Sequence, residues 1–236
     1  MRPHLVKDDE KFASTSYSKF LDRVRSASKA LDKIYNETGR TALYAVNVTG
    51  RLCELKKRIL AVINEGLNAI LISYITLGFS VLRFIAEDKD IQVPIFAHRV
   101  MHGVLSRYSD HGIDFGVLVK LARLAGADIV QIGSIRGEHV ETKIDIVRRI
   151  AILFQKLSNI KKSLPAITSG ITPKTIPYNL NRINTTDVIF ILGRGAYFDA
   201  GRVATGVKAA LQAIDVAIKG ISFKNLPKNT THSKRH

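Results

Sequence analysis

Short apolar runs alternate with longer amphipathic segments along most of this chain. Runs rich in Val, Ile, Leu and Ala are typical of strands buried on both faces of a parallel sheet. We expect six such strands, at residues 43–46, 69–73, 93–97, 128–132, 165–168 and 188–192. The segments between them repeat apolar residues every three or four positions, as helices that cover a sheet do. These helices are expected at residues 52–65, 79–87, 115–125, 142–157, 174–181 and 201–219.

The N-terminal part of the chain adds one more strand and helix. Residues 16–36 have helical spacing, Gly39 is placed to end that helix, and residues 5–7 would end a short strand before it. The chain is therefore an α/β protein of about seven strand–helix units. Periodicity alone does not distinguish a closed barrel, which needs eight strands to avoid an exposed edge, from a doubly wound sheet.

Length and composition fit one domain. At 236 residues with 46% hydrophobic content, the chain has the size of a single α/β barrel. We assign residues 1–221 to this domain and residues 222–236 to a basic tail that is too polar to order itself. The lone Cys53 fits a reducing compartment, and no apolar stretch is long enough to span a bilayer. A cytoplasmic protein is expected.

The chain is strongly basic, with 36 Lys and Arg against 20 Asp and Glu, a net charge of +16. Such a charge attracts anions. The basic residues, for example Arg148 and Arg149 or Lys161 and Lys162, are spread over amphipathic stretches without interleaved aromatics, so we interpret them as solvated helix faces. This distribution disfavours nucleic acid as the partner.

Polar residues gather where the expected strands end. In parallel α/β folds this rim carries the active site, and the last two strand ends commonly hold a phosphate with backbone N–H groups. A phosphorylated small-molecule substrate is therefore expected. The residues concerned are Lys7, Asp8, Asp9, Glu10, Asn47, His98, Arg99, His102, Gln131, Ser169, Gly170, Gly193, Arg194 and Gly195.

Each of these motifs also has an ordinary structural explanation. Asp9 and Glu10 offer the oxygen ligands that Mg²⁺ prefers, yet acids near a helix start are stabilising without any metal. Two histidines beside Arg99 suit proton transfer and phosphate binding, but a histidine at a strand end is more often structural. The Gly-Arg-Gly stretch lacks the rest of a dinucleotide fingerprint, which disfavours nucleotide binding.

Several longer motifs occur together and in order: LVKDDE, FAHRVMHGV, SRYSDHGIDFGVLVKLARLAGAD, IGSIRG, ITSGI and LGRGAYFDAGRVATGVKAALQA. Over about residues 5–220 they resemble the barrel of the ribulose bisphosphate carboxylase (RuBisCO) large subunit and of RuBisCO-like proteins. The resemblance implies a TIM-type (β/α)8 barrel. Because the chain begins near the family's second strand, we expect it to lack the first strand with its catalytic lysine, and the family's N-terminal domain.

The resemblance also implies roles for individual residues. In the proteins it resembles, CO₂ carbamylates the lysine of KDDE, which would make Lys7 catalytic and, with Asp9 and Glu10, a ligand of Mg²⁺. His98 would handle a proton. The remaining implied contacts, to substrate hydroxyl or phosphate groups, are those of Arg99, His102, Ser169, Gly170, Gly193 and Gly195, and we add Asn47 and Gln131 at the same rim.

The chain departs from the carboxylase pattern in the loop where CO₂ is met. Glu138 stands where carboxylases present a lysine, so a negative charge would face the developing carboxylate, and carboxylation is expected to fail. Arg136 carries a planar fork that does not replace a compact ammonium group. Gln131 replaces a usual histidine, and Ile171 and Arg194 replace phosphate-loop glycines.

The function expected from these features is Mg²⁺-dependent enolisation or isomerisation of a phosphorylated ketone, such as a diketo phosphate of methionine salvage. One alternative is a truncated or split carboxylase large chain, and another is a non-catalytic remnant that binds anions. A homo-oligomer, or an upstream fragment that supplies the missing strand, is the expected protein partner.

Overall fold

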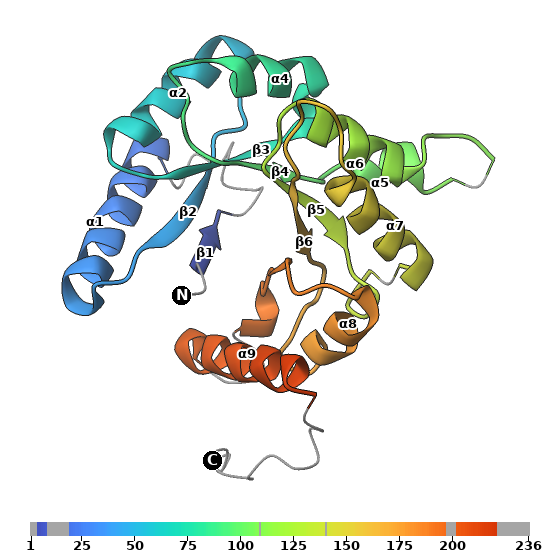
Figure 1. Ribbon diagram of the computed structural model, residues 1–236. Coiled ribbons are helices and arrows are strands. Elements are labelled where there is room, and N and C mark those ends of the chain that lie inside the picture. The colour runs from blue at the N-terminus through green and yellow to red at the C-terminus, as the bar shows by residue number, and fades with distance from the viewer. Residues whose placement is uncertain (1–3, 9–18, 109, 140, 197–201, 221–236) are drawn as a thin grey trace. The chain divides into compact units, whose positions relative to one another are not determined.

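The computed structural model describes residues 4–8, 19–108, 110–139, 141–196 and 202–220. Strands and helices alternate along it (Figure 1). The strands are β1 (His4–Lys7), β2 (Ala42–Asn47), β3 (Ala69–Ser73), β4 (Ile95–His98), β5 (Ile129–Gly133), β6 (Leu164–Ile167) and β7 (Ile189–Phe190). The helices are α1 (Phe20–Thr38), α2 (Leu52–Asn64), α3 (Tyr74–Leu77), α4 (Phe79–Glu87), α5 (His102–Ser106), α6 (Phe115–Leu124), α7 (Lys143–Phe154), α8 (Ile176–Ile183), the 3₁₀ helix η2 (Arg194–Ala196) and α9 (Val203–Ile218).

The strand order decides between the two α/β architectures. The sheet of the described residues has seven strands in the order β1-β2-β3-β4-β5-β6-β7, and β1 to β5 pair in parallel. Each strand therefore lies next to its successor in the chain. A doubly wound sheet would reverse this order at a switch point, whereas a (β/α) barrel never does. The predicted barrel type of seven strand–helix units is confirmed.

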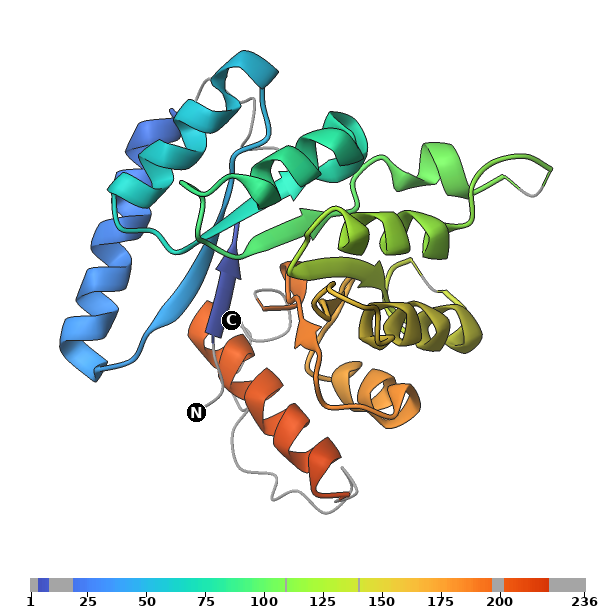
Figure 2. The ribbon, with the colours of Figure 1, turned by 45° about the horizontal axis from the view of Figure 1, so that its top comes forward.

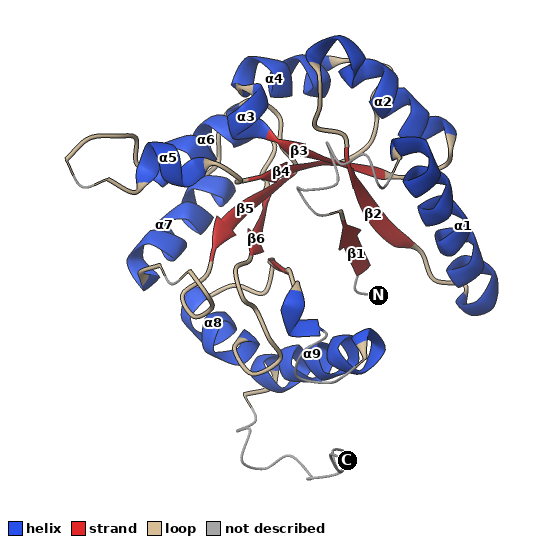
Figure 3. Ribbon diagram, turned by 180° about the vertical axis from the view of Figure 1, so that it is seen from behind, coloured by secondary structure: helices blue, strands red, loops and turns tan. Residues whose placement is uncertain are grey.

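By internal packing the chain divides into two compact units, Met1–Ile132 with Val147–Ala166, and Gly133–Ile146 with Ile167–His236. In the first unit, α1, α2, α4 and α6 lie along the same side of the strands (Figures 2 and 3). In the second unit, α9 packs against both α8 and η2. The assignment of residues 1–221 to one domain stays a prediction, and the tail at 222–236 lies outside the described residues.

The core follows the apolar spacing of the sequence. All five residues of β3 are buried, and α2 buries Leu55, Ile59 and Val62, which recur on one helix face. The first helix ends at Gly39, whose φ of 64° allows its N–H to bond the carbonyl of Tyr35 at 2.7 Å. These helices are amphipathic, and no helix of the described residues is long and apolar enough to cross a membrane.

Three short elements differ from the sequence-based prediction. The short helices α3 and α5 were not expected, because four or five residues carry too little periodicity to be recognised. β7 has two residues where five were expected. Such differences lie at the ends of strands.

Two basic residues contradict the interpretation of solvated helix faces. Arg149 is 6% exposed, and its guanidinium donates to the carbonyl of Ile132 at 3.0 Å. Arg123 is 1% exposed and donates to four backbone carbonyls, those of Lys161 (2.9 Å), Ile152 (2.6 Å), Gln155 (2.7 Å) and Ile160 (3.5 Å). Burial lowers the pKa of Arg123. Its planar fork thus holds the turn that joins α7 to β6.

Replacement of Arg123 by Met is expected to lower the free energy of unfolding by about 4 kcal/mol, because several buried carbonyls would lose their donor. Urea unfolding followed by circular dichroism measures this change. Arg83→Met is the control, since Arg83 bonds the exposed Glu87 on α4, and it should cost at most about 0.5 kcal/mol. Equal losses in the two variants would contradict the role given to Arg123.

Candidate active site

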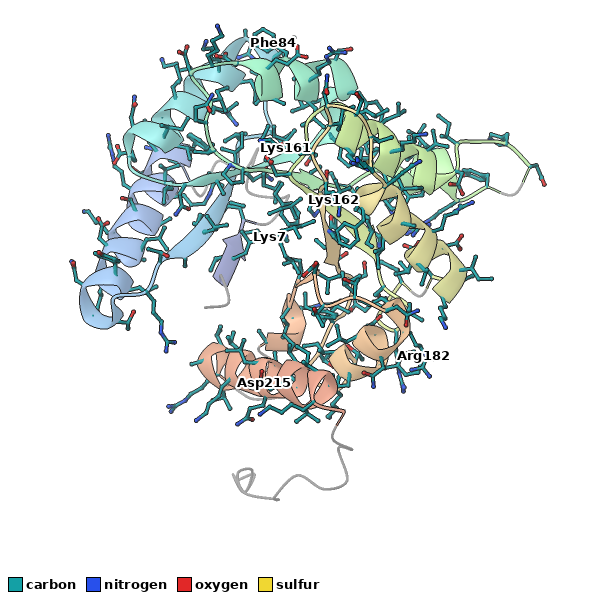
Figure 4. All side chains as sticks on the ribbon, in the orientation of Figure 1. Lys7, Phe84, Lys161, Lys162, Arg182 and Asp215 are labelled. Carbon is teal, nitrogen blue, oxygen red and sulfur yellow. The ribbon has the colours of Figure 1, made fainter. Side chains whose placement is uncertain are left out.

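The segment after β1 carries the predicted metal ligands. Lys7 is the last residue of β1, is half-buried, and its Nζ donates to the carbonyl of Asp8 at 3.1 Å (Figure 4). Asp9 and Glu10 lie outside the described residues. The described part of the chain contains no group of three His, Cys, Asp or Glu side chains that could hold a metal ion. The ligand set of Lys7, Asp9 and Glu10 therefore stays a prediction.

Asp8, to which the sequence assigned no separate role, anchors this segment. It is 4% exposed, and its Oδ2 accepts hydrogen bonds from Arg23 Nε at 2.9 Å and from the N–H of Asn47 at 3.0 Å. Its Oδ1 accepts from the hydroxyl of Tyr44 at 2.7 Å. Burial, then the Asp8 carboxylate, raises the pKa of Tyr44. One carboxylate thus joins the end of β1 to β2 and α1 and positions Lys7.

Asp8→Asn should lower the free energy of unfolding by about 3 kcal/mol, because it removes the negative charge of a largely buried ion pair with Arg23. Chemical denaturation of the purified variant measures this. Asp90→Asn removes an exposed carboxylate that bonds Lys56 at 2.9 Å, and it should change stability little. If both variants unfold at the same denaturant concentration, Asp8 is not the anchor.

The ends of β2 and β3 form a hydrogen-bonded pair. Asn47 is fully buried, and its side-chain Oδ1 accepts the N–H of Thr49 at 3.1 Å. The hydroxyl of Thr49 in turn accepts the N–H of Ser73 at 2.9 Å. Ser73 lies directly beside His98 in the register of β3 and β4. The predicted residue Asn47 thus shapes the rim that holds His98.

His98, Arg99 and Gln131 come together at the ends of β4 and β5. His98 is 7% exposed, and its Nδ1 accepts the N–H of Val100 at 3.1 Å, so a neutral ring carries its proton on Nε2. Gln131 is also 7% exposed, and its Oε1 accepts the N–H of Arg99 at 3.0 Å. An amide at this position orients the strand end without titrating.

A strained turn brings His102 back toward the same strand end. Met101 has a φ of 69°, an unusual value for a residue with a side chain, and the N–H of His102 bonds the carbonyl of Arg99 at 3.0 Å. The imidazole lies 4.5 Å from the ring of Phe115, centroid to centroid, and its Nδ1 contacts Ser106 Oγ at 3.1 Å. Backbone strain of this kind is concentrated at functional sites.

The guanidinium groups of Arg99 and Arg149 both lie close to the ring of Phe115. The central guanidinium carbons of Arg99 and Arg149 lie 5.6 and 4.6 Å from its centroid. Burial lowers the pKa of Arg99 to about 10, and burial together with the charge of Arg99 lowers that of Arg149 to about 10. Burial raises the pKa of Tyr74, and both arginines oppose this shift. This concentrated positive charge favours an anionic ligand.

The hydroxyl of Tyr74 is buried with no hydrogen-bond partner among the described residues. Tyr74→Phe should therefore raise the free energy of unfolding by about 1 kcal/mol, since it removes an unsatisfied polar atom. Tyr44→Phe should lower it by about 2 kcal/mol, since it removes the bond to the Asp8 carboxylate. Parallel thermal and urea unfolding of the two variants tests the opposite signs, and a destabilised Tyr74→Phe would refute this account of its hydroxyl.

In the second unit, the loop after β5 is held by one buried side chain and one backbone carbonyl. The Oδ1 of Asn179, on α8, accepts the N–H of Ile135 at 2.9 Å and that of Arg136 at 3.2 Å, and its Nδ2 donates to the Arg136 carbonyl at 2.9 Å. The carbonyl of Ser169 accepts the N–H of Glu138 at 2.9 Å. The guanidinium of Arg136 lies 5.0 Å from the ring centroid of Tyr178, also on α8.

The glycine motifs of this unit combine strain with close backbone approach. Ser169 and Gly170 have φ values of 76° and 71°, so two successive residues are left-handed. A Cβ on Gly170 would lie 2.6 Å from Cγ of Glu138. A Cβ on Gly195 would lie 2.2 Å from the carbonyl oxygen of Ile171, whereas one on Gly193 would meet nothing within 4 Å. Gly195 is thus required by packing, and Gly193 leaves open space.

Glu138 and Arg194 form an ion pair across 56 positions of the sequence. Both are departures from the pattern that the chain resembles, one at the loop lysine and the other at a phosphate-loop glycine. Their side chains are 50% and 70% exposed. The two substitutions therefore act on each other.

Sequence reasoning found most strand-end residues but missed four supporting ones. Asp8 was inside a recognised motif, and its position between Lys7 and Asp9 was the only signal. Tyr74, Arg149 and Asn179 gave no local signal, because their partners are distant in the sequence. Only the fold brings such residues to the site.

The family model of the ribulose bisphosphate carboxylase large chain, catalytic domain, matches residues 3–235. The chain belongs to this family. The predicted resemblance is confirmed over nearly the whole sequence.

The relatives include two kinds of enzyme. The chain is 32% identical over 232 residues to the ribulose bisphosphate carboxylase of Pyrococcus horikoshii, covering 98% of this chain and 54% of the relative. It is 36% identical over 220 residues to the 2,3-diketo-5-methylthiopentyl-1-phosphate enolase of Exiguobacterium sibiricum, covering 93% and 55%. The chain thus spans about half the length of the curated relatives it matches.

A solved structure of the same family has the same fold. The octameric ribulose-1,5-bisphosphate carboxylase/oxygenase of Pyrococcus horikoshii, in complex with sulfate, superposes with a TM-score of 0.88 at 32% identity. The match covers 94% of this chain and 52% of that chain. The fold of this chain therefore agrees with that of the family.

Proposed function

We propose that this chain serves a Mg²⁺-dependent enolisation or isomerisation of a phosphorylated ketone, in the manner of a RuBisCO-like protein. The observation that carries the proposal is Glu138, which stands at the loop lysine position and pairs with Arg194. The 36% identity to a diketo phosphate enolase supports it. The cytoplasmic location expected for such an enzyme is part of the same proposal.

The chain's own groups suit enolisation of a phosphorylated ketone. The neutral His98 ring carries its proton on Nε2, because Nδ1 accepts the N–H of Val100, so His98 is suited to donate a proton to the enolate oxygen. Arg99 and His102, at the strand end where the buried positive charge collects, bind the phosphate. Gln131 fixes the backbone of Arg99, and Asn47 shapes the rim. In the second unit, Ser169 and Gly170 contact substrate hydroxyl groups.

The donor set at the end of β1 fits Mg²⁺. We assign the metal to Asp9, Glu10 and a carbamate on Lys7, because all three supply the hard oxygen ligands that Mg²⁺ prefers. Lys7 is half-buried, and Asp8 holds the segment in place. When bound, the metal would stabilise the negative charge of the enediolate.

The same geometry disfavours carboxylation. A carboxylate at position 138 would repel the carboxylate that forms when CO₂ adds. Arg136 is an insufficient substitute, because its backbone is bonded to Asn179 and its guanidinium lies near the ring of Tyr178. We therefore place the reaction at the enolisation step.

The rival function is ribulose bisphosphate carboxylation by a chain that acts together with another polypeptide. The 32% identity to the Pyrococcus horikoshii carboxylase favours it. In this case copies of the chain assemble, as those of the octameric relative do. Neither function calls for nucleic acid or a membrane.

Deuterium exchange tests the proposal. A phosphorylated diketone incubated with the chain in D₂O should gain deuterium beside its carbonyl only when Mg²⁺ and bicarbonate are both present. Lys7→Ala should lower the exchange rate by about 100-fold, as loss of a proton-transfer or metal-binding group does. Mass spectrometry of the recovered ketone measures the rate.

Lys57→Ala is the matched control, because Lys57 is an exposed lysine on α2. It should exchange at the wild-type rate. Exchange that is unchanged in Lys7→Ala, or absent from every phosphorylated ketone tested, would refute the proposal. Incorporation of labelled bicarbonate into ribulose bisphosphate would instead establish the carboxylase.

A further inference from the structure

The Glu138–Arg194 pair lies at the glycine loops of the second unit. The side chain of Glu138 lies directly over Gly170, because a Cβ on that glycine would come within 2.6 Å of Glu138 Cγ. Arg194 stands between Gly193, which faces open space, and Gly195, which packs on Ile171. An arginine in a glycine-rich loop is a natural ligand for phosphate. In this chain Arg194 instead binds the carboxylate of Glu138.

The pair is more than a chance surface contact. Its members are 56 positions apart, so no helical spacing brings them together. The backbone of Glu138 is held separately, by its N–H bond to Ser169 and by the bonds of Asn179 to the preceding loop. The carboxylate is therefore presented to Arg194 by a loop that is already fixed.

We propose that Glu138 is an internal anion that occupies Arg194 and the adjoining glycine loop, and so excludes a phosphate group from this loop. This inference rests on the proposed function and specifies its substrate. The part of the substrate that meets this loop is therefore uncharged. A phosphate group would have to displace Glu138 before it could bind here.

Inorganic phosphate tests this selectivity without any reaction. Calorimetric titration in Mg²⁺-free buffer at low ionic strength compares the wild-type chain with Glu138→Gln. The variant should bind phosphate about fivefold more tightly, or gain a second phosphate site. A fivefold change in affinity is about the contribution of an exposed ion pair that competes with the ligand. Because no metal and no ketone are present, failure of enolisation does not affect the result.

Two further variants identify the cause of any gain. Glu87→Gln is the matched control, because it frees Arg83 from an ion pair of 2.7 Å with similar exposure and makes the same change in net charge. It should leave phosphate affinity unchanged. The double variant Glu138→Gln with Arg194→Gly should return to the wild-type affinity.

Three outcomes would overturn the inference. Phosphate affinity equal in Glu138→Gln and the wild-type chain would show that Glu138 excludes nothing. An equal gain in Glu87→Gln would reduce the effect to net charge. A gain that persists in the double variant would place the phosphate away from Arg194.

Discussion

The pairing of each strand with its successor is the constraint on which the rest of this structure depends. Parallel neighbours point their carboxyl ends the same way, so residues separated by dozens of positions reach one edge of the sheet. In the first unit this brings Lys7, Asn47 and His98 to strand ends, and the register sets Ser73 beside His98. The chemistry of the chain is a consequence of that order.

Buried polar groups fix the positions of the groups proposed to react. Asp8 bonds three donors and so holds the end of β1. In the second unit Asn179 holds the loop that carries Glu138, through hydrogen bonds to the backbone of that loop. Neither residue is proposed to touch the substrate. The hydrogen bonds of both residues must all be formed, because a buried polar group without a partner lowers the stability of the fold.

The two compact units differ in how their charged side chains are paired. In the first unit, Arg99 and Arg149 lie by one aromatic ring, and burial lowers the pKa of each to about 10. In the second unit, the exposed Arg194 is neutralised by Glu138. The first unit therefore favours an added anion, whereas the second unit supplies its own. A family fold can change its substrate in this way without any change in strand order.

The sequence by itself determined the family, the number of strands, and most residues at their ends. These follow from local patterns, since apolar runs and short motifs need no knowledge of distant partners. Only the tertiary structure decided which polar groups support the site. The sequence predicted that Arg149 lies on a solvated helix face, but the residue is buried. In the sequence Glu138 and Arg194 are two separate departures from the family pattern, whereas in the fold they form an ion pair. Burial and long-range pairing depend on the whole chain, so no window of sequence contains them.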